Sequence, residues 1–170
     1  GGPPPLLDVS HTRELRAVWV ATVSRLDFPS STTLTPAAAR AELGSMVDVV
    51  ADAGFNAILF QVRPESDALY ASPLEPWSRF VSGTQGTSPG YDPLAILLEL
   101  AHRQGVEVHA WINPFRGLTS TTIVAAPNHV TQRFPEAAIP HNGAVVMDPS
   151  HAGVRAHIVS VVRDITRRYD

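Results

Sequence analysis

The stretches Phe60-Gln61-Val62-Arg63-Pro64 and His109-Ala110-Trp111-Ile112-Asn113-Pro114-Phe115-Arg116 decide the fold. Each begins as an apolar run typical of a buried strand and ends in Gln, Arg, Asn or aromatic side chains suited to a polar ligand. In a barrel of alternating strands and helices, such groups gather where the parallel strands end and the loops begin. The two stretches therefore predict two strand ends at one common site.

Three apolar runs predict three strands, at residues 15–22, 56–62 and 106–112. Each run is nearly continuous, which is typical of parallel strands covered on both faces. The chain between them contains helical patterns rather than hairpin turns. This order predicts parallel strands joined by right-handed crossovers.

Helices are predicted over residues 36–53 and 93–104, because each has a capping residue, a proline at its first position and a glycine at its end. A third helix is predicted from about residue 151 to residue 169, with Ser150 as its cap. The remaining segments, 64–91 and 113–149, are predicted to be long loops. Loops of that length are usually functional or disordered, and the aromatic residues of the first favour order.

The fold class is therefore α/β, with parallel βα units of a TIM-type barrel. About three units are present, whereas a barrel needs eight strands and typically about 250 residues. The chain ends at Asp170, where a fourth strand would be due. Because natural proteins avoid exposed strand edges, we expect either part of a larger barrel or self-association through the open edges.

The composition limits the partners. The chain has 170 residues, 44% of them hydrophobic and 17% charged, and a net charge of -3, so nucleic acid is not an expected partner. It lacks cysteine, which excludes disulfides and thiolate sites, and no apolar run approaches the roughly 20 residues of a membrane span. Residues 1–13 read as a Gly/Pro-rich linker or trimmed terminus, and residues 14–170 as the barrel domain.

Alternation along the strands predicts which side chains point into the barrel. The inward sets are Leu59, Gln61 and Arg63 on the second strand and Glu107, His109, Trp111 and Asn113 on the third. Both sets become more polar toward the ends of the strands, where a ligand would lie.

The polar and aromatic candidates each have two interpretations. Arg63, Asp67 and Arg116 could bind a carboxylate or paired sugar hydroxyls, or could form an ion-pair network that holds the loops. Trp111, Trp77 and Tyr70 could stack on sugar rings or simply pack. For His109, a hydrogen-bonded core histidine is favoured over a catalyst.

Glycoside hydrolysis requires two carboxyl groups that flank one bond. Glu107 begins its strand, at the wrong end of a barrel, so Asp67 and Asp148 remain as candidates, although neither has a partner at a defined spacing. The histidines lack paired spacing, and neither a phosphate-binding loop nor a serine nucleophile elbow is present, so we expect no metal and no cofactor.

Several blocks of sequence together resemble the bacterial glycosyl hydrolase-like 10 family. They are Glu14 to Thr22, Phe60 to Pro64 with Asp67 to Tyr70, Glu75-Pro76-Trp77-Ser78, Gly83 to Gly86, Tyr91 to Leu94 and His109 to Arg116. The resemblance covers Glu14 to Asp170 in the right order. It implies a barrel glycosidase that hydrolyses peptidoglycan glycan strands, preferably those stripped of stem peptides, in exported or lipid-anchored envelope proteins.

The resemblance also implies a glycan-binding role for Arg63, Asp67, Trp77, Trp111, Asn113 and Arg116. In the family, the segment that resembles Arg167 to Asp170 leads into a strand with an acidic Asp-Asp-Tyr-type motif, so the main catalytic pair is expected beyond Asp170.

We therefore predict a cofactor-free glycoside hydrolase of cell-wall type, represented by the N-terminal half of its barrel and located in the periplasm, the envelope or the extracellular space. The alternative is a non-catalytic glycan-binding module. The predicted substrate-binding residues are Gln61, Arg63, Asp67, Tyr70, Trp77, His109, Trp111, Asn113 and Arg116, with Asp67 and Asp148 as candidate catalytic acids.

Overall fold

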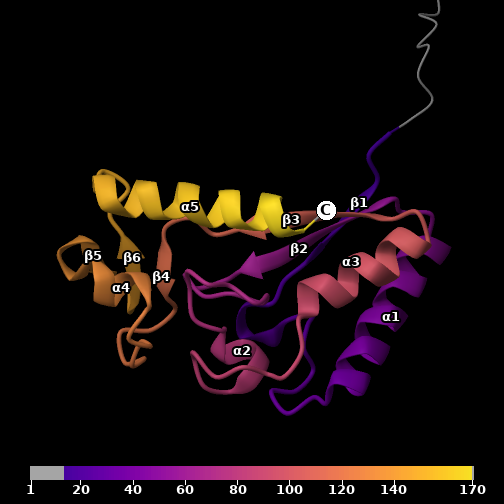
Figure 1. Cartoon of the computed structure of the whole chain (residues 1–170), viewed down its shortest axis with the longest axis horizontal. Coiled ribbons are helices and arrows are strands. Elements are labelled where there is room, and N and C mark those ends of the chain that lie inside the picture. The colour runs from indigo at the N-terminus through magenta and orange to yellow at the C-terminus, as the bar shows by residue number, and fades with distance from the viewer. Residues whose placement is uncertain (1–13, 170) are drawn as a thin grey trace, which may run out of the picture.

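A computed structural model describes residues 14–169; the predicted linker at 1–13 and Asp170 lie outside this range. Its central sheet contains β1 (Ala17–Val20), β2 (Ala57–Arg63) and β3 (Glu107–Ile112), all parallel, in the order β1-β2-β3 (Figure 1). The predicted α/β fold of parallel βα units is confirmed. Sequential parallel strands joined through helices form part of a barrel, as the sequence predicts.

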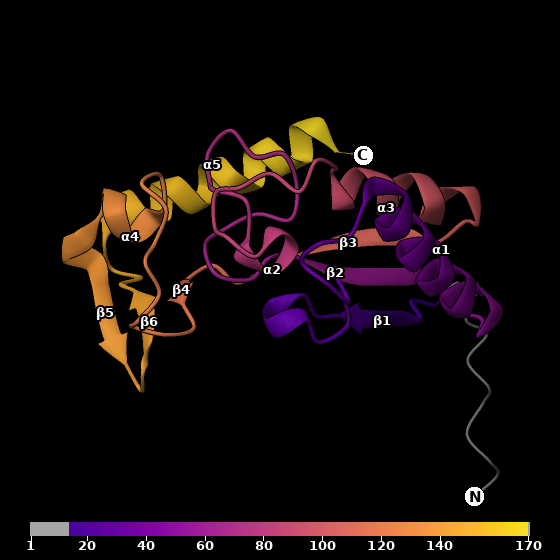
Figure 2. The ribbon, with the colours of Figure 1, turned by 90° about the horizontal axis from the view of Figure 1, so that it is seen from below.

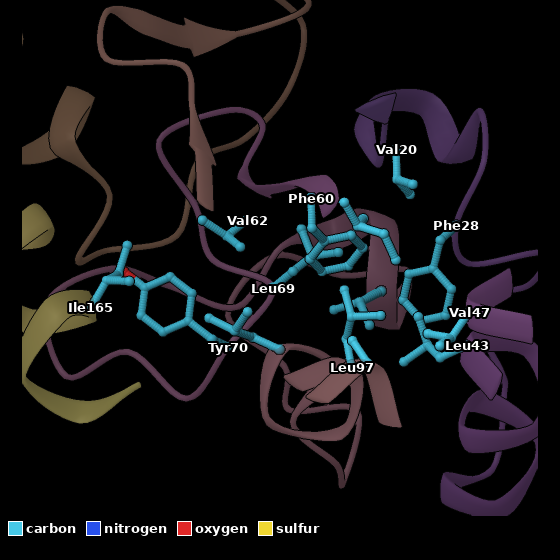
Figure 3. Packing of buried hydrophobic residues seen from close by; sticks show 14 of the residues in the cluster. Val20, Phe28, Leu43, Val47, Phe60, Val62, Leu69, Tyr70, Leu97 and Ile165 are labelled. Carbon is cyan, nitrogen blue, oxygen red and sulfur yellow. The ribbon is translucent and has the colours of Figure 1, made fainter. Parts of the chain in front are cut away.

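Two helices cover one face of this sheet, namely α1 (Pro36–Asp52) and α3 (Pro93–Arg103) (Figure 2). Both begin at the predicted caps, because the Thr35 side chain accepts a hydrogen bond from the Ala38 N–H and the Asp92 side chain accepts one from the Ala95 N–H. The main core lies between these helices and the sheet (Figure 3), and includes Phe28, Leu43, Val47, Ile58, Phe60, Val62 and Leu97. The opposite face of the sheet carries the inward-pointing side chains.

The last helix, α5 (Ala152–Arg168), contributes Val161 and Ile165 to the same core. The predicted cap is wrong by one residue: the His151 ring accepts the hydrogen bond from the Val154 N–H. Ser150 lies one residue before the cap, and its N–H donates to the Asp148 carboxylate at 2.7 Å.

A second, antiparallel sheet occupies the predicted loop at 113–149, so that prediction is wrong. Its strands β4 (Arg116–Leu118), β5 (Ala138–His141) and β6 (Ala144–Met147) lie in the order β4-β6-β5. The short helices α4 (Val130–Arg133) and η2 (Pro135–Ala137) precede β5. This sheet lies at the far end of the molecule from α1 and α3, and α5 extends from it back to the central sheet (Figure 1).

The long segment after β2 is ordered and deeply packed, as its aromatic residues predict. All ten residues from 61 to 70 are buried, and the segment contains the short helix α2 (Arg79–Ser82). The 3-10 helix η1 (Val23–Arg25) follows β1 at the same end of the sheet. Within residues 14–169, none of the helices has the length and apolar character that a membrane crossing requires.

Candidate functional site

The end of β2 organises the loops at the carboxyl edge of the sheet. The buried Gln61 side chain accepts hydrogen bonds through Oε1 from the N–H groups of Thr22 and Val23, at 2.9 and 2.8 Å. These contacts fix the loop after β1 against β2. The Gln61 Nε2 is buried and has no hydrogen-bond partner among residues 14–169. In this structure Gln61 therefore holds a loop in place.

Arg63, the last residue of β2, is fully buried and paired. Its Nε and Nη2 donate to the Glu75 carboxylate at 2.8 and 2.6 Å, and its Nη1 donates to the Asn113 carbonyl at 2.6 Å. His157 of α5 contacts the same carboxylate through Nε2 at 2.8 Å. Burial alone would raise the pKa of Glu75, but the Arg63 charge and the bonds from His157 and Arg63 outweigh it and lower that pKa to about 2. Glu75 is thus a buried anion within a fixed ion cluster.

Asp67, a candidate catalytic acid, lies fully buried in the segment after β2. Its carboxyl oxygens accept from the Glu65 N–H at 3.2 Å and from the Gln85 side-chain amide at 3.0 Å. Burial, the largest effect, raises the pKa of Asp67 to about 7. The group can therefore hold a proton near neutral pH, as a general acid must, but it lies beneath the surface.

The alternative predicted for Arg63, Asp67 and Arg116, an ion-pair network that holds the loops, is confirmed for Arg63, whereas Asp67 and Arg116 form no ion pair within residues 14–169. Arg63 pairs with Glu75 of the first long loop and, through it, with His157. Sequence reasoning missed both partners as site residues. Glu75 could have been found, because it stands in the motif Glu75-Pro76-Trp77-Ser78, whereas nothing in the sequence links residue 157 to the end of β2.

Two tryptophans meet on the inward face of the sheet. Trp19 of β1 is 61% exposed, and its ring meets that of Trp111 edge to face, with centroids 4.8 Å apart. The Trp111 Nε1 donates to the Asn113 Oδ1 at 3.0 Å, and the Asn113 Nδ2 donates to the Pro64 carbonyl at 3.1 Å. Sequence reasoning missed Trp19, although the alternation that places Trp111 inward also applies to β1. The pair offers an exposed aromatic surface beside an oriented amide.

His109 lies on the same inward face, in register with Leu59 and, through it, with Trp19. The prediction of a core histidine is wrong, because its side chain is 48% exposed and contacts Glu107 at 3.1 Å. The His109 ring is therefore available to a ligand or to a further segment of protein.

The remaining predicted site residues lie outside the Trp19–Trp111 pair and the Arg63 ion cluster. Tyr70 is buried against Tyr169, with ring centroids 5.7 Å apart, and Trp77 packs half-buried against the core. Arg116 is exposed on β4, where its carbonyl accepts a hydrogen bond from Ser66. Asp148 follows β6, and hydrogen bonds from Ser150 lower its pKa.

Asp67 and Asp148 do not form a pair of facing carboxylates. The first is buried beside the central sheet, whereas the second lies at the end of a strand in the antiparallel sheet, and they share no hydrogen-bond partner. In the described part of the chain, no group of three or more His, Asp or Glu side chains is arranged to hold a metal ion. The described residues thus bring an aromatic pair and an oriented amide together at the strand ends, beside buried ion pairs.

Known proteins are similar in sequence to this chain over nearly its whole length. Residues 14–170 match the family described as Glycosyl hydrolase-like 10. The chain is 34% identical to glycosyl hydrolase YngK of Bacillus subtilis over 169 residues, which are 98% of this chain and 33% of that protein. It is also 34% identical to glycosyl hydrolase DigH of Escherichia coli K12 over 186 residues, covering 99% of this chain and 42% of that protein.

A Thermotoga maritima α-L-fucosynthase resembles the structure with a TM-score of 0.48 at 12% identity, over 75% of this chain and 25% of that one. The chain spans between a third and about two-fifths of the length of the curated relatives named above. The family match covers every motif at the strand ends described here. The chain therefore belongs to the glycosyl hydrolase-like 10 family.

Proposed function

We propose that this chain forms the N-terminal part of the substrate site of a glycoside hydrolase that acts on peptidoglycan glycan strands. The observation that carries the proposal is the pair formed by the exposed Trp19 and the half-buried Trp111, beside the Asn113 amide at the ends of the strands. Flat apolar rings next to fixed polar groups suit pyranose rings, which present apolar faces and a rim of hydroxyls. The names of the relatives, both glycosyl hydrolases, support the same chemistry.

In this proposal, the main catalytic carboxylates come from sequence outside residues 14–170. Within the described residues Asp67 is buried and Asp148 lies in another sheet, so neither has a facing partner across an open site. Hydrolysis by an acid and a base needs both groups on either side of one bond. The greater length of the curated relatives leaves room for such residues. The proposed mechanism requires no cofactor, and the proposed substrate is consistent with a protein of the cell envelope, either exported or lipid-anchored.

The aromatic pair makes the proposal testable by substitution. In the full-length protein, Trp111→Ala should weaken binding to peptide-free glycan strands about tenfold, because one face of the sugar-binding surface is lost. The melting temperature should change little, because the ring is only partly buried. Phe55→Ala, at a half-exposed aromatic residue before β2, serves as the matched control. Unchanged affinity together with a large fall in melting temperature would show that Trp111 is a packing residue.

Mass spectrometry of the soluble products distinguishes an enzyme from a module that only binds. The exposed pair without facing carboxylates is the observation that keeps the second function in view. Oligosaccharides released by the full-length protein, but not by a folded fragment of residues 14–170, are the expected result. Binding without products from the full-length protein would favour the non-catalytic module.

A further inference from the structure

The Asn113 side chain, which accepts a hydrogen bond from Trp111, is attached to a backbone segment that Arg63 holds. The Asn113 N–H donates to the Arg63 carbonyl at 3.1 Å, and the Arg63 Nη1 donates to the carbonyls of Asn113 and Pro114 at 2.6 and 3.1 Å. The side-chain amide is engaged at both ends, because Oδ1 accepts from the Trp111 Nε1 and Nδ2 donates to the Pro64 carbonyl. The position of the Arg63 Nη1 therefore helps to determine where the amide and the indole ring lie.

The Arg63 guanidinium is in turn oriented by Glu75. Its Nε and Nη2 donate to the two oxygens of that carboxylate, at 2.8 and 2.6 Å, as a bidentate pair. Because the guanidinium is planar and rigid, fixing these two nitrogens also fixes the direction of Nη1. Both side chains are fully buried, so the pair is shielded from water. A displacement of the Glu75 carboxylate would thus be passed on to the Asn113 backbone.

His157 of α5, the helix that extends back to the central sheet (Figure 1), contacts the same carboxylate. Its Nε2 lies 2.8 Å from the Glu75 Oε1, and its Nδ1 lies 3.1 Å from the Nη1 of Arg133. A guanidinium can only donate, so Nδ1 is the acceptor, and Nε2 carries the proton that His157 donates to Glu75. Because Val161 and Ile165 pack α5 into the main core, the imidazole holds the carboxylate from a fixed helix.

We propose that His157 is a positioning residue for glycan binding: it holds Asn113 and, through it, Trp111 in the orientation that binds the sugar. The link runs through Glu75 and Arg63, and its hydrogen bonds are between 2.6 and 3.0 Å long. This inference rests on the proposed function and adds to it a residue that does not touch the sugar, since only 5% of His157 is exposed. Removal of the imidazole should therefore weaken glycan binding without removing any contact with the glycan.

Substitution of His157 in the full-length protein tests this link through the affinity for peptidoglycan glycan strands, measured by calorimetric titration. His157→Phe keeps a flat ring but removes the donor to Glu75, so it should weaken binding about tenfold. His157→Gln, whose side-chain amide can donate in place of the ring Nε2, should restore the affinity to within about threefold of that of the unmodified protein. His102→Phe, at an exposed histidine on α3, is the control and should bind as the unmodified protein does.

A double-mutant cycle with Asn113 separates positioning from a general loss of stability. If His157 acts through Asn113, His157→Phe should cost no further affinity in an Asn113→Ala background. A role in stability alone would lower the melting temperature in both backgrounds and leave the affinity of the folded protein unchanged. Circular dichroism checks that each variant folds, and His157→Leu, with its smaller side chain, replaces His157→Phe if the phenyl ring prevents folding.

Three results would overturn the positioning role while leaving the proposed function intact. They are an unchanged affinity in the folded His157→Phe variant, a His157→Gln variant that binds as weakly as His157→Phe, and an equal loss of affinity with and without the Asn113 side chain. Failure of the unmodified full-length protein to bind any glycan would instead overturn the proposed function, and this inference with it.

Discussion

The Arg63–Glu75–His157 cluster sets the electrostatic character of the strand ends, and its stability can be tested one residue at a time. Glu75→Gln leaves the buried Arg63 guanidinium without its counterion, so it should destabilise the fold by about 3 kcal/mol in urea denaturation. The matched control is Glu99→Gln, which removes an exposed partner of Arg40 and should cost less than about 1 kcal/mol. Similar losses in the two variants would contradict a special role for the buried pair.

The same cluster predicts how stability depends on acid pH. The pKa of Glu75 is lowered in the folded state to about 2, from an ordinary value of 4.5. Its stabilisation is therefore fully present above pH 4.5 and is lost as the pH falls toward 2. Glu75→Gln should lose less stability over this interval than the unmodified protein, as measured by melting temperature in a pH series.

Asp67 should produce the opposite dependence. Burial raises the pKa of its carboxyl from 3.8 to about 7, so the folded state retains a proton that the unfolded chain has released. Stability should accordingly decrease as the pH rises from about 4 to 7 and then level off. Asp67→Asn removes the titrating group, so its pH series of unfolding free energies should lack this decrease. A variant with the same slope as the unmodified protein would show that another group is responsible.

Among the elements, the long helices and the apolar parallel strands could be predicted, whereas the short strands of the antiparallel sheet could not. The caps Thr35 and Asp92 act within three residues of themselves, and both helices begin where the sequence predicts. The strands of the antiparallel sheet are three or four residues long and depend on partners elsewhere in the chain, which a periodicity pattern cannot detect.

The sequence does contain one local signal for that sheet. Asn142 and Gly143 form the two-residue connection between β5 and β6, with φ angles of 48° and 79°, and Asn-Gly is the strongest short-range signal for a hairpin. At the candidate site, alternation placed Trp111 on the face that it shares with Trp19, whereas the register of β2 shifts between Gln61 and Arg63, so that Arg63 pairs with Ile112. It could not predict that Arg63 would be buried, because the carboxylate and imidazole that bury it come from separate loops and helices.

The hairpin can be tested through its glycine. Gly143→Ala should destabilise the chain by about 1 kcal/mol because of its positive φ, since no atom lies within 4 Å of the added methyl group. Gly44→Ala is the matched comparison within α1, where the added carbon lies 4.0 Å from Leu100. It should stabilise the helix by about 0.5 to 1 kcal/mol. Unfolding in urea measures both changes, and a neutral Gly143→Ala would argue against the hairpin conformation.

For the whole molecule, the unpaired edges of the central sheet are the features that most favour self-association. β1 and β3 each have a neighbour on one side only among the described residues, and Ala110 of β3 is exposed. The isolated chain should therefore self-associate as its concentration rises, as measured by light scattering. Ala110→Lys should reduce this association by placing a charge on the edge strand, whereas Val159→Lys on the exposed side of α5 should not. A monomer at all concentrations would contradict the prediction.

The contact between His157 and Glu75 joins residues 82 positions apart in the chain. During synthesis, the segment after β2 leaves the ribosome long before α5 does. The Glu75 carboxylate therefore cannot contact the His157 imidazole until almost the whole of this sequence has been made. The ends of the central strands and the last helix should consequently become protected from hydrogen exchange together rather than in chain order. The packing around the end of β2 is thus completed only when the most distant helix of the described chain has docked.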